Sequence, residues 1–270
     1  MLDVAHAANA STEPLAWYAA RRLNDAFRRT ATWWLLEDDT GPVSSLLAYP
    51  LSLRFGGDPL RGYGLGSVAT RPSAQRRGYA AALCAQAGEA SAAPVGVLFS
   101  AIPPRLYTSL GFRVMPAFQF ACSDVAALAA SGPHAPLRPI DPLAELPLLR
   151  ATFDATQDGL RIARDAAAWL ASLNNNPEDR FFAVAGGTLR LVDAADGVEV
   201  VELFSDAPAA ALRSVAALVQ QRGGSSLSGW FAPPGEVVEH FEAQSRERTL
   251  PMVRGPAEII TAWLSVADYF

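Results

Sequence analysis

The segment that most constrains the fold of this 270-residue chain is the hexad Gln75-Arg76-Arg77-Gly78-Tyr79-Ala80. It follows an apolar stretch, residues 65–70, and opens an alanine-rich run, residues 81–87. This order predicts a strand, a short turn and a helix. The amides at a helix N-terminus have no partner within the helix and lie at the positive end of its dipole, so they bind anions well. Gly78 and the small Ala80 would let phosphate oxygens approach those amides. The pattern therefore predicts a site for a phosphate-bearing ligand.

Two motifs in this region resemble those of a known family. Residues 68–80 read Val-Ala-Thr-x-Pro-x-x-Gln-Arg-Arg-Gly-Tyr-Ala, which is similar to the acetyl-CoA signature of the GNAT superfamily of N-acetyltransferases. Further along, residues 106–112 read Leu-Tyr-Thr-Ser-Leu-Gly-Phe. This segment resembles the family's second landmark, a tyrosine just before Leu-Gly-Phe. Both landmarks stand in the family's order and spacing.

The resemblance implies a set of acetyl-CoA-binding residues. In GNAT enzymes the hexad amides hold the pyrophosphate of CoA, and the preceding strand pairs with the pantetheine arm. An amide near Val68 would polarise the thioester carbonyl. An ordinary glycine-containing helix start is the alternative reading of the hexad. Carried onto this chain, the binding positions are Val68, Ala69, Thr70, Gln75, Arg76, Arg77, Gly78, Tyr79 and Ala80.

The resemblance also implies a general acid. Tyr107 matches the family position whose phenol protonates the leaving thiolate, and a phenol with a pKa near 10 is protonated at neutral pH. The alternative role of Tyr107 is core packing beside Leu106 and Phe112. No cysteine stands at either landmark, so an acetyl-cysteine intermediate is not expected.

The general base is left open by the sequence. Glu37, Asp38 and Asp39 follow a predicted strand, although acids in such turns are usually only solvated. A second candidate is the C-terminal carboxylate on Phe270, because the chain resembles enhanced-intracellular-survival-type acetyltransferases, whose terminal carboxylate enters the active site. The ending Ala267-Asp268-Tyr269-Phe270 could instead be a tail packed for stability, and water is a third possibility.

The first part of the chain predicts a helix over residues 14–29, since Thr12-Glu13-Pro14 is a start signal and apolar residues recur at helical spacing. Strands are expected over residues 30–36, 43–55, 95–100 and 113–122. A further strand is expected to follow the turn at residues 56–59 and to end at Thr70. Helices are expected after the hexad and around Tyr107. This order is close to that of GNAT proteins, whose additional first strand would be missing or reduced to residues 2–4.

A second series of strands and helices, in a similar order, is predicted after a connector over residues 123–136. It lacks a glycine hexad after Ser205, so it is not expected to bind CoA. The sequence thus predicts an α/β fold (α+β, mixed sheet), with a GNAT catalytic domain over residues 1–130 and a degenerate GNAT-like domain over residues 131–270. The enhanced-survival-type enzymes share this tandem core and add a sterol-carrier-like domain. In the second half, strands are expected over residues 137–140, 227–231 and 248–254, and three more within residues 180–205. Helices are expected over residues 143–156, 161–173, 206–222 and 237–243.

Composition excludes several classes of function. All 22 basic residues are arginine, so a Schiff-base lysine is excluded, and the net charge of −5 argues against a nucleic-acid partner. Cys84 and Cys122 are expected to be small buried hydrophobes. The three histidines are isolated, so no metal site is expected. No apolar stretch reaches the roughly 18 residues of a membrane span, and the N-terminus lacks a signal-peptide pattern, so a cytoplasmic protein is expected.

These observations together predict a transferase that moves an acetyl group from acetyl-CoA to a primary amine by direct attack in a ternary complex. The alternative is a non-catalytic acyl-CoA-binding or sensing protein. The partner is expected to be a small-molecule or peptide amine, of unknown identity, and a homo-oligomer is possible. Trp33, Trp34 and Tyr49 could hold a cationic amine, but a place in the core is the preferred reading.

Overall fold

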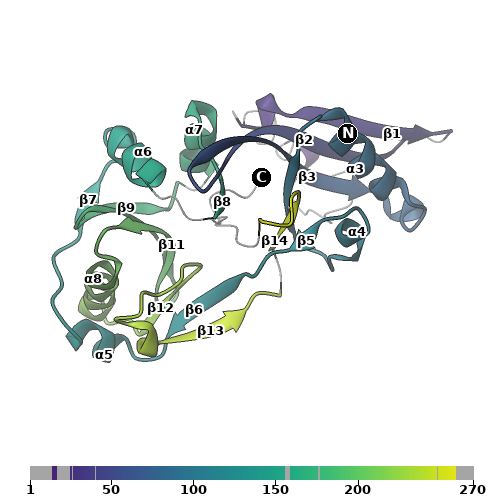
Figure 1. Cartoon of the computed structure of the whole chain (residues 1–270). Coiled ribbons are helices and arrows are strands. Elements are labelled where there is room, and N and C mark those ends of the chain that lie inside the picture. Colours follow the sequence, from purple (N-terminus) through teal and green to yellow (C-terminus); the bar gives the residue numbers. More distant parts are fainter. Residues whose placement is uncertain are drawn as a thin grey trace.

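The computed structural model describes residues 14–16, 25, 27–39, 41–155, 159–175, 177–247 and 249–259. The described part of the chain contains two mixed sheets of seven strands each, which form two neighbouring lobes (Figure 1). The predicted α/β fold with mixed sheets is therefore confirmed. None of the helices in these ranges is long and apolar enough to span a bilayer.

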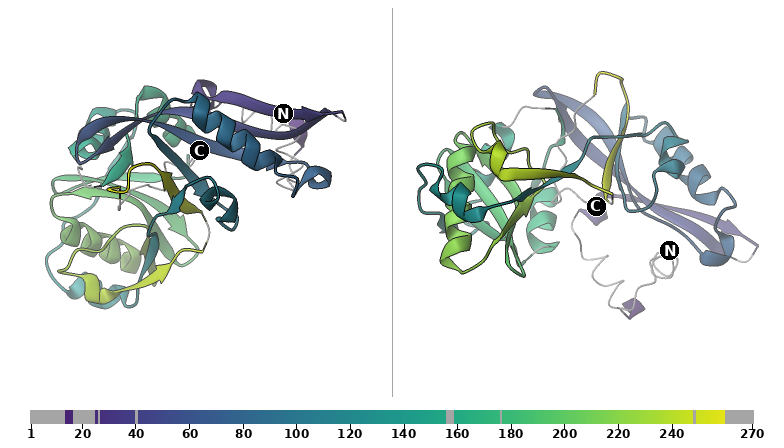
Figure 2. Two further views of the ribbon diagram at one scale, coloured as in Figure 1. Left: turned by 45° about the vertical axis from the view of Figure 1, so that its right-hand side comes forward. Right: turned by 90° about the horizontal axis from the view of Figure 1, so that it is seen from below.

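The first sheet is built on a long antiparallel meander. Its strands run in the order β1 (Thr32–Asp38), β2 (Gly41–Phe55), β3 (Asp58–Thr70), β4 (Val95–Ser100), β14 (Leu250–Arg254) and β5 (Arg113–Val114), and β8 (Leu160–Ile162) also pairs with β2. Alternate residues of β2 enter opposite clusters: Leu47 and Tyr49 lie in one, Leu46 in the other. The helix α3 (Tyr79–Ala90) covers the Leu46 face with Leu83 and its neighbours (Figure 2).

The second sheet is covered by helices on both faces. Its strands run in the order β13 (Phe241–Ser245), β6 (Phe118–Cys122), β12 (Ser226–Gly229), β11 (Gly197–Ser205), β10 (Gly187–Ala194), β9 (Arg180–Val184) and β7 (Arg138–Ile140). The helices α5 (Val125–Ala130) and α8 (Pro208–Gln221) pack on one face through Leu128 and Leu212. The helices α6 (Leu146–Ala155) and α7 (Ala166–Asn175) pack on the other face through Phe153 and Trp169.

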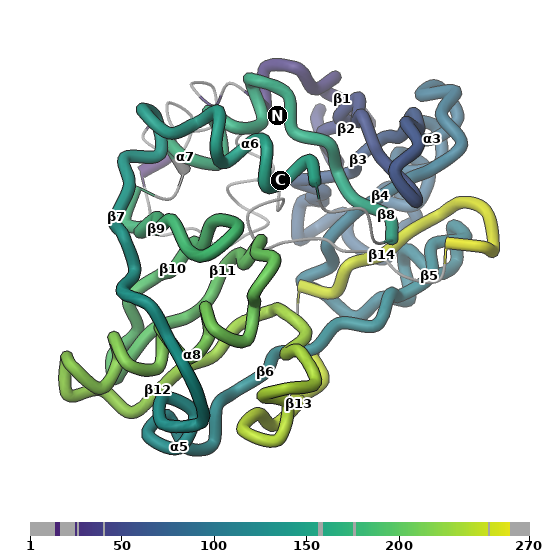
Figure 3. Tube along the Cα trace, turned by 60° about the vertical axis from the view of Figure 1, so that its left-hand side comes forward, coloured from purple at the N-terminus to yellow at the C-terminus, as the bar shows by residue number. Residues whose placement is uncertain are grey.

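The two sheets exchange strands. β6 lies between β12 and β13 of the second sheet, and β14 lies between β4 and β5 of the first, so the chain crosses between the lobes in both directions (Figure 3). The single strand predicted over residues 113–122 is therefore wrong: it is β5 and β6, in different sheets. The strand predicted over 248–254 is confirmed as β14, but it belongs to the first sheet. The domain boundary after residue 130 stays a prediction. Each sheet contains strands from both sides of this boundary.

Three other element predictions need correction. The predicted connector contains α5, whose N-terminus is capped by Asp124 through a 2.9 Å hydrogen bond from the Ala127 amide. The helix predicted over 161–173 begins as β8, because the edge of β2 takes up Leu160–Ile162, and α7 starts only at Ala166. The helix predicted over 237–243 is a single 3-10 turn, η3 (Val238–His240), followed by β13. Most of the helix predicted over 14–29, and the strand considered at 2–4, lie outside the described residues.

Candidate active site

The hexad forms an open loop between β3 and α3. After the 3-10 turn η2 (Pro72–Ala74), Arg76 has a φ of 63° and Gly78 has a φ of 84°. The Gln75 side chain donates to the Thr70 carbonyl at 3.2 Å and so ties the loop to the end of β3. A Cβ on Gly78 would meet nothing within 4 Å, which leaves the space in front of the helix N-terminus open. Among the described residues, the space beside Gly78 is therefore open toward the first-turn amides of α3.

A wedge opens between β3 and β4 beside this loop. The two parallel strands pair only over Gly62, Tyr63 and Gly64 of β3. Beyond Gly64 the pairing of the two strands ends, and among the described residues the rest of β3 pairs only with β2. The predicted pantetheine-binding residues Val68, Ala69 and Thr70 lie on this diverging part. An extended ligand arm can pair with such a strand edge as another strand would.

A β-bulge interrupts β3 within the wedge. Ser45 of β2 is opposite Ala69, but Leu47 is opposite Gly66, so Ser67 and Val68 have no Cα partner on β2. Ser67 has a φ of 50°, in the left-handed region. Bulges re-aim backbone groups and are common beside active sites. The bulge lies at the residue, Val68, whose amide the family resemblance assigns to the thioester carbonyl.

Tyr107 lies on the short helix α4 (Arg105–Thr108), which follows β4, the other wall of the wedge. Its side chain is 6% exposed and meets the Phe112 ring edge-on at 6.3 Å. Tyr107 belongs to the same apolar cluster as Leu83 of α3, and Val68 packs against that cluster. The structure therefore brings the predicted acid and the predicted thioester-binding strand to one side of the first sheet.

The candidate bases are placed differently. Glu37, Asp38 and Asp39 lie at the turn after β1, and the register sets Leu36 beside Ser44, which in turn pairs with Thr70. This turn is therefore at the phosphate end of β3, beyond the bulge. Phe270 lies outside the described residues.

The last described residues of the chain lie on the face of the first sheet opposite α3. Ile259 is 2% exposed in the cluster that contains Leu47 and Val253. The Arg113 guanidinium donates to the carbonyls of Gly255, Pro256 and Ile259 at 3.0, 2.8 and 3.3 Å. One arginine thus fixes the course of the chain up to residue 259.

The aromatic residues considered for amine binding are mainly structural. Tyr49 is 1% exposed and stacks on Phe27 with ring centroids 5.0 Å apart. Trp33 packs against the cluster on that face, and Trp34 packs against the α3 cluster. The preferred prediction of a core role is confirmed for Tyr49.

Both cysteines behave as buried or half-buried thiols. Burial raises the pKa of the Cys84 thiol from 9.0 to about 12, and burial also raises the pKa of Cys122. Within the part of the chain that the structure describes, no group of three or more histidine, cysteine or acidic side chains is arranged to hold a metal ion.

The second lobe differs at the position of the loop. After β11, only Asp206 and Ala207 precede α8, and Pro208 stands at the first helical positions and so removes one amide donor. There is no extended loop comparable to residues 71–78 that could surround a pyrophosphate. That the second half does not bind CoA stays a prediction.

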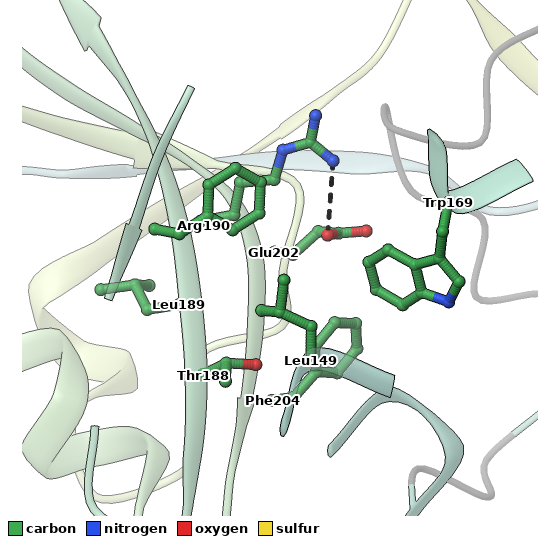
Figure 4. Close-up of a pocket in the computed structure, with 8 residues that line it drawn as sticks. Leu149, Trp169, Thr188, Leu189, Arg190, Glu202 and Phe204 are labelled. Atoms are coloured by element: carbon green, nitrogen blue, oxygen red, sulfur yellow. Dashed lines mark ion pairs between the residues drawn. The ribbon is translucent and has the colours of Figure 1, made fainter. Parts of the chain in front are cut away.

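A small cavity in the second lobe is filled with its own polar network (Figure 4). Its volume is about 10 Å³, room for one water molecule. Glu202 pairs with Arg164 and lies 3.6 Å from Arg190, which also pairs with Asp179, so buried charges alternate in sign. The network joins α7 to the sheet and leaves no space for a substrate. The cavity is lined by Leu149, Trp169, Phe181, Thr188, Leu189, Arg190, Glu202 and Phe204.

Comparison with known proteins gives a family match for the first part of the chain. Residues 2–115 match the family model described as an acetyltransferase (GNAT) domain. This part of the chain is therefore similar to the GNAT acetyltransferases. Among curated protein sequences, none is significantly similar to the chain.

Several solved structures resemble this chain in fold over nearly its whole length. A GCN5-related N-acetyltransferase from Anabaena variabilis is 16% identical with a TM-score of 0.70, over 96% of this chain and 69% of that one. A probable N-acyltransferase of unknown function from Enterococcus faecalis is 13% identical with a TM-score of 0.71, over 96% and 69%. Eis1 from Mycobacterium abscessus is 14% identical with a TM-score of 0.65, over 93% and 69%. The likeness extends through both sheets, as the predicted two-part GNAT fold requires.

Sequence reasoning missed three residues beside the bulge. Ser67, Arg28 and Asp25 form a connected polar group there. Gly66 within a strand pattern was the available signal, because an isolated glycine in a strand often marks a bulge. Nothing in the local sequence links Ser67 to Arg28, which lies 39 residues earlier.

Proposed function

We propose that this protein is an N-acetyltransferase that moves an acetyl group from acetyl-CoA to a primary amine by direct attack in a ternary complex. The observation that carries the proposal is the wedge between β3 and β4, which leads into the open loop at the N-terminus of α3. The same wedge has Val68 on one wall and is followed on the other by α4 with Tyr107.

Each part of the site has a role in this reaction. The loop amides from Arg76 to Ala80 would bind the pyrophosphate, and the edge of β3 would orient the pantetheine arm. The amine nitrogen attacks the thioester carbon, and the carbon–sulfur bond breaks while the Val68 amide donates to the carbonyl oxygen. The Tyr107 phenol gives its proton to the leaving thiolate.

The attacking amine must lose a proton. The acceptor in this proposal is the carboxylate predicted on Phe270 or a water molecule, because the acidic turn after β1 lies at the phosphate end of β3. Adding one residue after Phe270 separates the two. A large loss of turnover with unchanged acetyl-CoA affinity supports the carboxylate, and unchanged turnover removes it.

The first test is acetyl-CoA binding by calorimetry, followed by thiol release with a panel of amines. Gly78→Ala places a side chain in front of the loop amides, at a φ of 84°, and should weaken binding at least about tenfold, since a left-handed alanine alone costs about 1–2 kcal/mol. Gly56→Ala is the matched control: it has a φ of 58° with open space around it, but lies in the β2–β3 turn.

The outcomes separate the two candidate functions. Binding with amine-dependent release of CoA establishes the acetyltransferase. Binding without release on any amine favours the acyl-CoA sensor. Absence of binding by the unmodified protein would refute both.

A further inference from the structure

A partly buried chain of polar contacts joins the segment before β1 to the bulge of β3. Arg28 Nη1 donates to Ser67 Oγ at 3.0 Å, and Arg28 Nε lies 3.3 Å from Asp25 Oδ2. The side chains of Arg28 and Asp25 are only 12% and 8% exposed. Such a contact is screened less by solvent than a surface ion pair.

Asp25 is arranged to hold the Arg28 guanidinium. Its Oδ1 accepts hydrogen bonds from the amides of Phe27 at 2.9 Å and Arg28 at 3.2 Å, while its Oδ2 faces the guanidinium. Asp25 therefore fixes the start of the turn η1 (Arg28–Thr30) and the direction of the Arg28 side chain.

Arg28 approaches the bulge from the face opposite α3. Its neighbour Phe27 stacks on Tyr49, which belongs to the cluster opposite to the one that α3 covers. The guanidinium is thus on the other side of the sheet from the helix of the phosphate-binding loop. It can brace β3 without occupying the path from that loop into the wedge.

Ser67 needs such a brace. A residue with a Cβ is disfavoured at a φ of 50°, and this conformation persists only where the surroundings fix it. Ser67 has no Cα partner on β2 or β4, so strand pairing does not hold this residue directly. The Arg28 hydrogen bond supplies a contact that ties the Ser67 side chain in place.

We propose that Arg28 is a positioning residue for acetyl transfer: it locks Ser67 in the left-handed conformation and so aims the adjacent Val68 amide at the thioester carbonyl oxygen. This inference rests on the proposed function. A donor aimed in advance at the oxygen where charge develops stabilises the transition state without reorganisation. Loss of the brace lets the amide turn away, which affects carbonyl polarisation more than the binding of CoA.

The test compares Arg28→Gln with Arg29→Gln, a change at the neighbouring exposed arginine. The readouts are the infrared stretching frequency of the ¹³C-labelled carbonyl in bound acetyl-CoA, the acetyl-CoA Kd and kcat. Arg28→Gln should reduce the bound-state frequency shift and lower kcat about tenfold, less than the roughly 10²–10³-fold effect of deleting an oxyanion donor. Its Kd should stay within about twofold of the unmodified value, and Arg29→Gln should match the unmodified protein.

Two further variants test whether Arg28 acts through Ser67. Ser67→Ala removes the hydroxyl that Arg28 contacts but retains a Cβ, so the left-handed conformation loses its support. It should therefore reproduce the Arg28→Gln effects, and the double variant should lose nothing more. Ser67→Gly adopts the same φ without strain, so it should lose less than Ser67→Ala.

An unchanged carbonyl frequency in Arg28→Gln would overturn the inference. So would a double variant whose loss of kcat equals the sum of the two single losses in free energy, or a loss of activity that follows from weaker acetyl-CoA binding alone. If the unmodified protein binds acetyl-CoA but acetylates no amine, the proposed function fails, while the carbonyl frequency still decides the role of Arg28. Melting curves of all variants identify any that simply fails to fold.

Discussion

Two buried tyrosines in one apolar cluster allow the acid role of Tyr107 to be separated from packing. Tyr107 and Tyr63 are 6% and 4% exposed, and both meet the Phe112 ring edge-on. Tyr107→Phe keeps the ring, so kcat should fall about 10²–10⁴-fold, while the acetyl-CoA Kd stays unchanged. Tyr63 interacts with Arg254 of β14, so Tyr63→Phe should lower stability by about 1 kcal/mol and retain kcat. Steady-state kinetics and thermal unfolding distinguish them; full turnover in Tyr107→Phe would remove Tyr107 from the mechanism.

The buried thiol of Cys84 gives a pH dependence of stability. Burial raises its pKa from 9.0 to about 12, so the folded state keeps a proton that the unfolded chain releases. This contribution is complete below pH 9 and is lost as pH rises toward 12, by about 1.4 kcal/mol per pH unit. Cys84→Ala should flatten the decline of the unfolding free energy between pH 9 and pH 11. Urea unfolding at several pH values measures it, and parallel profiles for the two proteins would contradict a buried thiol.

At this same scale, the sequence revealed only what neighbouring residues encode. The loop at the hexad could be predicted because Gly78, the flanking strand and the alanine run act locally, and the structure gives Gly78 a φ of 84°. Tyr107 could be selected as the candidate acid from its place before Gly111 and Phe112. The contact between Arg28 and Ser67 could not be predicted, since it depends on how η1 lies across the sheet.

At the scale of elements, periodicity predicted most strands and helices but not their partners. The apolar alternation of β2 and the alanine-rich α3 follow directly from residue spacing. The strand pattern over 113–122 also holds, yet the break at Pro116 and Ala117 divides it between two sheets. Long-range packing determines which strands pair, and the periodic pattern of apolar residues contains no information about the partner. The same limit explains why β8 was read as the start of a helix.

The unequal connections after β3 and β11 predict how many acetyl-CoA molecules bind. Residues 71–78 form the open loop before α3, whereas Asp206 and Ala207 lead directly to Pro208 of α8. We therefore expect calorimetric titration to give one acetyl-CoA per chain, and Gly78→Ala to weaken that single transition at least about tenfold. A control variant, Gly223→Ala, carries the same left-handed strain after α8 and should leave the titration unchanged. A second site that survives Gly78→Ala would show that the second lobe also binds CoA.

At the scale of the whole molecule, the exchange of β6 and β14 makes each sheet depend on both parts of the chain. Without β14, β4 would keep only the short parallel contact with Gly62, Tyr63 and Gly64. Without β6, β13 would lose its neighbour and β12 would become an edge strand. Exposed edges of this kind favour aggregation. Residues 1–130 alone should therefore not fold cooperatively, even though they contain the whole GNAT landmark set.

A cut in the connector tests this dependence without removing any strand. Pro133 and His134 are exposed and lie between α5 and β7, so a protease recognition site can be inserted there. After cleavage, the two pieces should remain together in size-exclusion chromatography and bind acetyl-CoA with the affinity of the intact protein, because β6 and β14 still cross between the sheets. The isolated piece ending at residue 130 is the comparison and should show no cooperative thermal transition. Separation of the cleaved pieces into two folded proteins would mean that the lobes are independent domains and that the exchanged strands do not hold them together.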